Sequence, residues 1–181
     1  MKRNRPTWDE VVLMFENDKT AQEVFIEKHQ SELKELLTDL KEDGEDIYSY
    51  FDTAFSWVYG IIVDWREYEE DLVSYFNEAL GDNDSLSATY DEESNSEIII
   101  YNEEKHIVPL TESQADRYIV IRALRDILKV KYVFKLFTFS YMSDTHGFLL
   151  LPSSWWEEAE GQYPEKVKEL FMDITETLDF P

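Results

Sequence analysis

The sequence contains no cysteine, and only five glycines and five prolines in 181 residues. Without thiols the chain can form neither disulfides nor thiolate metal sites, and it has no thiol nucleophile. The glycines are too few and too scattered for a phosphate-binding loop, which needs several of them at fixed spacing. These absences fit a reducing compartment and exclude several classes of enzyme.

Long hydrophobic runs are also missing. The longest apolar-leaning run is FSWVYGIIV at residues 55–63, and a membrane-spanning helix needs ~20 residues. The first ten residues, MKRNRPTWDE, lack the apolar centre of a secretory signal peptide. We therefore expect a soluble, cytoplasmic protein that does not bind membranes.

Positive charge is scarce, with 17 Lys and Arg against 40 Asp and Glu, a net charge of −23. The imbalance is concentrated in residues 42–104, which hold nineteen acids and one base, Arg66. Affinity for nucleic acid comes largely from Lys and Arg on phosphates, so direct nucleic-acid binding is not expected. Such a field attracts a basic protein partner. Acidity that serves solubility alone is the alternative explanation.

Residues typical of catalytic sites are few. The histidines, His29, His106 and His146, lie far apart in sequence, and no HExxH, G-x-S-x-G or Walker motif occurs. Ser143, Asp144 and His146 are close in sequence, but a triad is defined by its geometry, and we interpret them as a polar turn. The sequence favours a protein that is not an enzyme and holds no metal or cofactor.

Apolar side chains are plentiful enough for a core, at 43% hydrophobic and 15% aromatic residues. Apolar spacing predicts helices over about 7–17, 20–42, 47–61 and 66–80, and then over 111–128 and from 154 and 164. Sequences of capping-box form at Thr7, Thr20, Thr111 and Ser154 support four of these starts. Strands are predicted over about 87–90, 97–101, 106–110, 131–139 and 148–151.

The predicted fold class is therefore α+β, with N-terminal helices followed by an antiparallel sheet of about five strands and its packed helices. We expect a single domain over residues 1–181, with a soft subdomain boundary near 81–85.

Two adjacent tryptophans, Trp155 and Trp156, raise a separate question. As neighbours in a helix they point about 100° apart. We expect one of them to pack in the core against Leu149 and Leu151, and the other to lie nearer the rim.

The predicted partner-binding surface lies in the acidic segment. Trp65 and Tyr68 are possible aromatic anchors, and surrounding carboxylates speed association with a basic partner. The predicted residues are Asp64, Trp65, Glu67, Tyr68, Glu70, Asp71, Asp82, Asp84, Asp91, Glu92, Glu93, Glu103 and Glu104. Alternatively, Trp65 and Tyr68 belong to the core and the interface surrounds Trp155 and Trp156. Six bases between Arg117 and Lys135 form either an ion-paired outer face or an internal dock for the acidic segment.

Small, acidic, cysteine-free chains with aromatic-rich cores and no catalytic motif resemble bacterial immunity proteins, which bind and neutralise a toxin, often a basic nuclease, inside the producing cell. The resemblance is one of composition, so no family residues are carried over. It implies that carboxylates of residues 64–104 occupy the toxin's Lys and Arg side chains in place of substrate phosphates. A DNA-mimic protein that inhibits a DNA-binding protein and an acidic adaptor are the alternatives.

Overall fold

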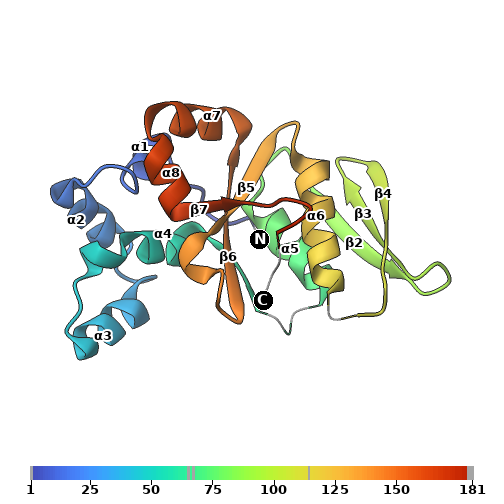
Figure 1. Ribbon diagram of the computed structural model, residues 1–181, viewed down its shortest axis with the longest axis horizontal. Coiled ribbons are helices and arrows are strands. Elements are labelled where there is room, and N and C mark those ends of the chain that lie inside the picture. Colours follow the sequence, from blue (N-terminus) through green and yellow to red (C-terminus); the bar gives the residue numbers. More distant parts are fainter. Residues whose placement is uncertain (1, 65, 67, 114, 179–181) are drawn as a thin grey trace.

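A computed structural model gives the fold and describes residues 2–64, 66, 68–113 and 115–178 (Figure 1). Within these residues, seven strands form two antiparallel sheets, one four-stranded with the order β1-β6-β5-β7 and one three-stranded with the order β2-β3-β4. Within the described residues, four α-helices precede the first strand along the chain, and the others lie between strands. The predicted α+β class is confirmed.

The elements have the following bounds. The helices are α1 (Trp8–Val12), α2 (Lys19–Lys28), α3 (Lys34–Asp43), α4 (Phe51–Tyr59), α5 (Glu69–Ala79), α6 (Asp116–Leu128), α7 (Ser153–Gln162) and α8 (Pro164–Leu170), with short 3-10 turns η1 (Ile47–Tyr50) and η2 (Thr138–Ser140). The strands are β1 (Ile61–Asp64), β2 (Leu86–Asp91), β3 (Ser96–Tyr101), β4 (Glu104–Pro109), β5 (Tyr132–Phe137), β6 (Thr145–Pro152) and β7 (Phe171–Asp173).

The four-stranded sheet is buried on both faces. Successive side chains of a strand point to opposite faces, and in β6 Phe148 and Leu150 join one hydrophobic core whereas Leu149 and Leu151 join another. The unbroken apolar run of β6 follows from this, because a strand covered on both sides has no polar face.

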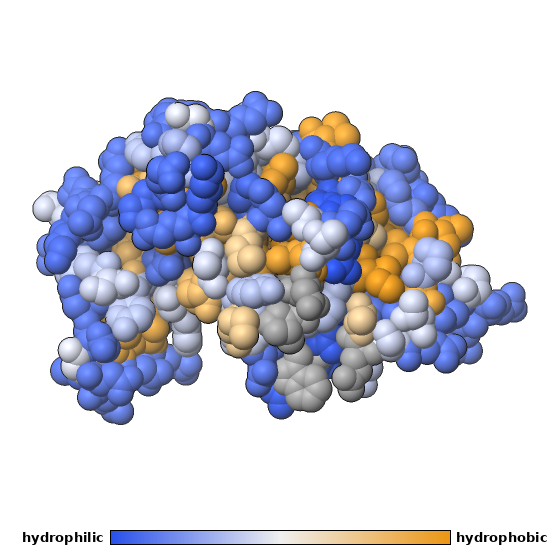
Figure 2. Space-filling view, in the orientation of Figure 1, coloured by the Kyte–Doolittle hydropathy of each residue, from blue (hydrophilic) through white to orange (hydrophobic). Residues whose placement is uncertain are grey.

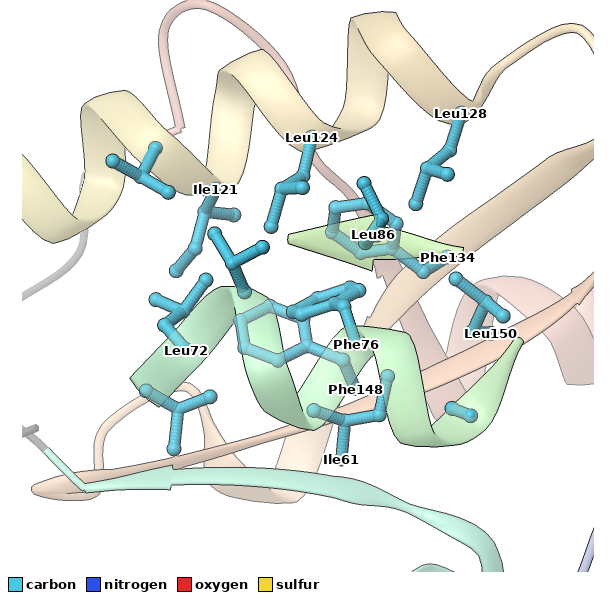
Figure 3. Packing of buried hydrophobic residues seen from close by; sticks show 14 of the residues in the cluster. Ile61, Leu72, Phe76, Leu86, Ile121, Leu124, Leu128, Phe134, Phe148 and Leu150 are labelled. Atoms are coloured by element: carbon cyan, nitrogen blue, oxygen red, sulfur yellow. The ribbon is translucent and has the colours of Figure 1, made fainter. Parts of the chain in front are cut away.

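The first core lies between the two sheets, where α5 and α6 pack side by side (Figure 3). Phe76 of α5 makes edge contacts with Phe134 of β5, with ring centroids 4.6 Å apart. Leu86 of β2 and Ile99 of β3 close this core from the three-stranded sheet. The core thus includes residues on both sides of 81–85, the expected soft boundary, which forms the connection between α5 and β2.

The second core joins α1–α4, α7 and α8 to the other face of the four-stranded sheet. Trp156 is 2% exposed and packs in this core, where its indole N–H donates to the carbonyl of Val133 (2.9 Å). Trp155 is half-buried, with its ring edge-on to Trp8 at 5.7 Å. The expectation that one tryptophan is buried in the core and the other lies nearer the surface is confirmed.

Several element boundaries differ from the sequence-based expectations. The helix predicted over 20–42 is two helices separated at His29–Leu33. Of the four capping boxes, the one at Thr7 is present, whereas Asp18 caps α2, and α6 and α7 begin at Asp116 and Ser153 without a side-chain cap. At α2 the carboxylate of Asp18 accepts the backbone N–H groups of Thr20 and Ala21, and so takes the capping place that sequence spacing alone assigned to Thr20.

The predicted helix over 47–61 ends early, at Tyr59, because Gly60 brings the chain into an extended conformation. A Cβ on Gly60 would lie 2.5 Å from the carbonyl oxygen of Ser56, so only glycine lets β1 start directly against α4. Ile61 then pairs with Phe148 as the first residue of an edge strand. No helix of the described chain is long and apolar enough to cross a membrane.

This contact leads to a prediction for two glycines. The Gly60→Ala variant should lower the free energy of unfolding by about 1–3 kcal/mol, because backbone must move to admit the methyl group. Gly161→Ala is the matched control: its Cβ meets nothing within 4 Å inside α7, so better helix propensity should raise stability by up to ~1 kcal/mol. Urea unfolding followed by circular dichroism measures both, and an equal response of the two variants would contradict the prediction.

Candidate functional site: the acidic three-stranded sheet and its cavity

The three-stranded sheet has one buried and one open face. Its register places Leu86, Ile99 and Val108 on the face that packs against α5 and α6. On the opposite face Ile98 lies across from Ile107, and Ile100 follows two residues along β3. Ile107 is 61% exposed and Ile100 40% exposed, so apolar side chains occupy the centre of a solvent-facing sheet.

Acids gather at the two ends of this sheet. The turn between β2 and β3 carries Asp91, Glu92 and Glu93, and the turn between β3 and β4 carries Glu103 and is followed by Glu104. The six-residue strands separate these ends by roughly 17 Å. Asp82 belongs with the second group, because Ser85 is hydrogen-bonded to Asn102 at that end. Glu103 has a left-handed backbone, with φ 74°.

Most acids of the segment have no cationic partner. Arg3 pairs with Glu78, Lys131 with Asp84, and His106 lies 4.0 Å from Glu104. In the described part of the chain, the following acids between residues 67 and 104 form no ion pair: Glu69, Glu70, Asp71, Asp82, Asp91, Glu92, Glu93, Glu97 and Glu103. Their charges act on the surroundings together.

Asp84, which the sequence placed among the contact residues, is buried and does not form part of this exposed surface. It is 4% exposed and accepts hydrogen bonds from Lys131 Nζ (2.5 Å), the Tyr132 hydroxyl (2.7 Å) and Asn102 Nδ2 (2.9 Å). Burial alone would raise the pKa of Asp84, but these donors outweigh it and lower the pKa to about 2. The carboxylate ties the α5–β2 connection to β5.

The remaining predicted residues lie at the start of α5. Asp64 at the end of β1 is held by Arg66, whose Nε and Nη2 each lie 2.9 Å from a carboxylate oxygen. Tyr68 is 75% exposed, and Glu70 accepts the backbone N–H of Tyr90 (3.0 Å), which brings this end of α5 to the β2–β3 turn. Asp71 is exposed beside it. Trp65 and Glu67 lie outside the described residues.

A cavity of about 770 Å³ opens at this corner, between the start of α5, the start of α6 and the β2–β3 end of the sheet. Carboxylates and two tyrosines dominate its lining, which consists of Arg66, Tyr68, Glu69, Glu70, Tyr90, Asn95, Glu97, Leu110, Glu112, Ser113, Asp116 and Arg117. The structure therefore joins Tyr68 and Glu70, which sequence reasoning selected, to Glu97, which it did not.

Glu97 is the most unusual group of the cavity. It is 1% exposed, on the inner face of β3 opposite Val108, and its Oε1 has no hydrogen-bond partner among the described residues. Burial, with smaller contributions from the nearby Glu70 and Glu69, raises the pKa of Glu97 to about 7. One sequence signal was available, because Glu97 lies on the same face of the strand as Ile99 and Tyr101. In the run Ile98-Ile99-Ile100, however, both faces carry isoleucine, so the sequence does not show which face is buried.

The basic cluster at 117–135 serves mostly elsewhere. Lys131 pairs with Asp84, but Arg125 pairs with Asp126 and Glu176, and Lys135 pairs with Asp173 and Glu160. Most of these bases are thus paired with acids outside the acidic segment. Among these contacts, only Lys131 binds an acid of that segment.

Other candidate sites are weaker. The burial of Trp156 removes it from the alternative interface around Trp155 and Trp156. A second cavity of about 440 Å³ beside Trp57, Ile62 and Phe139 has no charged lining residue; sequence reasoning missed it because these residues come from separate elements. The described residues contain no group of three or more His, Cys, Asp or Glu that could hold a metal ion.

The contacts of Asp84 predict how its loss affects stability. Asp84→Asn should lower the free energy of unfolding by about 2 kcal/mol at neutral pH, because it removes a buried charge from its donors. Since the folded pKa lies below the ordinary one, this difference should disappear as the pH falls from about 4 toward 2. The control is the exposed neighbour Asp82→Asn, expected to stay within about 0.5 kcal/mol; equal losses in both variants would contradict the assignment.

Glu97 predicts the opposite pH dependence. Its folded pKa of about 7 exceeds its ordinary value of 4.5, so the unfolded chain releases the proton first and stability falls as the pH rises between these values. Glu97→Gln should therefore match the parent protein near pH 4 and exceed its stability by about 2–3 kcal/mol near pH 8. Thermal and urea unfolding across this range measure the difference, and a pH-independent difference would overturn the assignment.

Comparison with known proteins adds no relative to these observations. No protein-family model, no curated protein and no solved structure matches this chain. The arguments for function therefore come from the acidic sheet and its cavity.

Proposed function

We propose that the chain is a non-enzymatic inhibitor that binds a basic protein through the outer face of the three-stranded sheet, as an immunity protein binds a basic toxin. One observation carries the proposal: exposed isoleucines occupy the centre of a sheet face whose two ends bear acids that, apart from Glu104, form no ion pair with another described residue. Figure 2 shows apolar atoms among the strands of this sheet, next to hydrophilic surface.

This arrangement has the anatomy of a protein interface. Such interfaces combine an apolar centre, which excludes water, with a polar rim. Ile100 and Ile107 would supply the desolvated centre. The acids at both ends would raise the association rate with a basic partner and align it along the strands.

The spacing of the acids favours a protein toxin over the DNA-mimic alternative. Imitation of duplex phosphates needs carboxylates distributed along a face, since DNA carries a charge about every 1.7 Å of helix axis. Here the acids form two groups separated by Ile98, Ile100 and Ile107. An apolar centre suits a folded partner with its own apolar patch between basic residues.

The mechanism of inhibition would be occlusion. A toxin that acts on nucleic acid holds phosphates with Lys and Arg side chains, and the carboxylates of this chain would occupy the same side chains. No bond is made or broken, so inhibition would be stoichiometric. The complex would form in the cytoplasm of the producing cell, before the toxin meets its substrate.

The test begins with the gene next to that of this chain. We expect its product to contain a basic domain that arrests growth when expressed alone, and co-expression of this chain to restore growth and yield a one-to-one complex. Growth arrest that persists despite co-expression would overturn the proposal. Displacement of a DNA-binding protein from DNA, without binding to the neighbouring product, would support the DNA mimic instead.

The proposed interface also predicts a salt-dependent association rate. Removing four charges should slow association more than tenfold at low salt and flatten its salt dependence, because exposed charges are screened beyond about 10 Å at 0.1 M salt. The variant combines Glu92→Gln, Glu93→Gln, Glu103→Gln and Glu104→Gln. Its matched control removes four exposed acids on α2 and α3, with Glu23→Gln, Glu27→Gln, Glu35→Gln and Asp39→Asn.

The apolar centre should act on dissociation instead. Ile107→Thr keeps a β-branched side chain in β4, and we expect it to raise the dissociation rate about tenfold, a loss of ~1.4 kcal/mol, with little change in association. Surface plasmon resonance at several salt concentrations separates the two rates. If the α2–α3 control slows association as much as the sheet variant does, the interface lies elsewhere.

A further inference from the structure

The cavity at the start of α5 contains a buried carboxyl group and two tyrosines, which suit one particular side chain better than a basic surface in general. We infer that this cavity receives the guanidinium group of one arginine side chain, and that Glu97 releases its proton as the guanidinium enters. The inference rests on the proposed function for the source of the arginine, the basic partner. Tyr90 and Asn95, which line the cavity, flank the acidic β2–β3 turn, so cavity and proposed interface are continuous.

The carboxyl group of Glu97 lacks a hydrogen-bond donor in the described chain. Glu97 is buried, and its Oε1 accepts no hydrogen bond in the described chain. A buried polar atom without a partner costs about 1–3 kcal/mol, and buried polar groups in folded proteins are nearly always hydrogen-bonded. A donor from outside the chain would remove this cost, and the cavity gives it access.

The charge around Glu97 is predominantly negative. Glu69 and Glu70 of α5 face the same cavity and form no ion pair in the described chain, and Glu112 adds another carboxylate from the loop before α6. Of the cationic lining residues, Arg66 is engaged by Asp64, and Arg117 is buried at the start of α6. The lining thus holds five carboxyl groups against two guanidinium groups, and this excess favours cations from outside over anions.

Asp116, also in the lining, is already satisfied. Its carboxylate accepts hydrogen bonds from the Thr111 hydroxyl and from the backbone N–H groups of Thr111 and Ser113. Burial would raise the pKa of Asp116, but these bonds outweigh it and lower the pKa. Asp116 therefore shapes the wall of the cavity, and Glu97 remains its open acceptor.

The two tyrosines of the lining favour arginine over lysine. Tyr68 and Tyr90 line the cavity, and a planar guanidinium can stack on aromatic rings and bind a carboxylate with two parallel N–H donors. It is also hydrated more weakly than an ammonium group, so it loses less on entering a buried site. A lysine would place one compact charge in a space of about 770 Å³.

Proton release follows from the chemistry of the pair. Below pH 7 Glu97 is mostly protonated before arginine binds, and a protonated carboxyl group can neither attract a cation strongly nor accept both N–H donors. When the guanidinium enters, the carboxyl O–H bond breaks, the proton leaves to solvent, and the carboxylate pairs with the guanidinium. One proton is released for each arginine bound, so binding strengthens as the pH rises toward 7 and levels off above it.

Other titratable groups near Glu97 need a control. His106 of β4 lies on the same face of the sheet, opposite Ile99, with Glu104 as its nearest acid at 4.0 Å. Histidine is the side chain that ordinarily titrates near neutral pH. A His106→Gln variant therefore separates its contribution from that of Glu97.

The experiment uses the full chain with N-acetyl-argininamide as the probe, N-acetyl-lysinamide as the matched control, and carbon-detected NMR of the glutamate carboxyl groups. We expect arginine affinity to rise about tenfold between pH 6 and pH 8, the consequence of one linked proton with a midpoint of about 7. The Glu97 resonance should show its midpoint shift to lower pH on binding. The Glu97→Gln variant should bind weakly and without pH dependence, whereas His106→Gln should behave like the parent.

The outcomes separate the two proposals. Equal affinities for the arginine and lysine probes, or a pH dependence that survives in Glu97→Gln, would overturn the arginine cavity. Suppose that the sheet variants weaken partner binding, and that partner binding keeps the same pH dependence in Glu97→Gln as in the parent protein. The cavity inference then fails and the proposed function stands. If the probe binds with the expected proton release but the neighbouring product does not bind, the proposed function fails alone.

Discussion

The burial of both faces of the β5–β6 pair is the constraint on which the rest of the structure depends. Because β6 sends Phe148 and Leu150 to one side and Leu149 and Leu151 to the other, each side must be covered by other elements. The N-terminal helices with α7 and α8 cover one face, and α5 and α6 cover the other. The three-stranded sheet can then pack only outside α5 and α6, as an outer layer with one free face.

That position explains why the unusual chemistry collects in one place. A sheet in the outer layer buries one face against helices and leaves its turns at the periphery, where unpaired acids are well hydrated. The cavity lies at the corner where α5 approaches the β2–β3 turn. Glu97 is buried at this cavity, whereas Glu70 and Glu112 in the lining are exposed to solvent. Electrostatic attraction over distance and a specific contact at close range are thereby available on one surface.

The sequence predicted the fold class and five strands that correspond to β2, β3, β4, β5 and β6, because these follow from local periodicity and turn residues. It did not predict β1 or β7. Ile61 fits the helical spacing of the residues before it, although Gly60 ends the helix, and Phe171 fits the helical spacing of the residues from 164 onward. Within the candidate site, Tyr68, Glu70 and Glu92 lie on or beside the surface as expected. The interior role of Asp84 depends on Lys131 and Tyr132, and that of Glu97 on strand phase. Both are contacts between distant parts of the chain, which composition does not encode.

The backbone angles of two glutamates have a consequence of another kind. Glu103, at the β3–β4 turn, and Glu112, in the cavity wall, have φ values of 74° and 58°. This left-handed region costs a side chain with a Cβ roughly 1 kcal/mol, and glycine occupies it freely. A chain shaped by stability alone would place glycine at both positions. Strained residues of this kind cluster where a protein meets its ligands. Under the proposed function, these two glutamates would place negative charge at the cost of backbone strain.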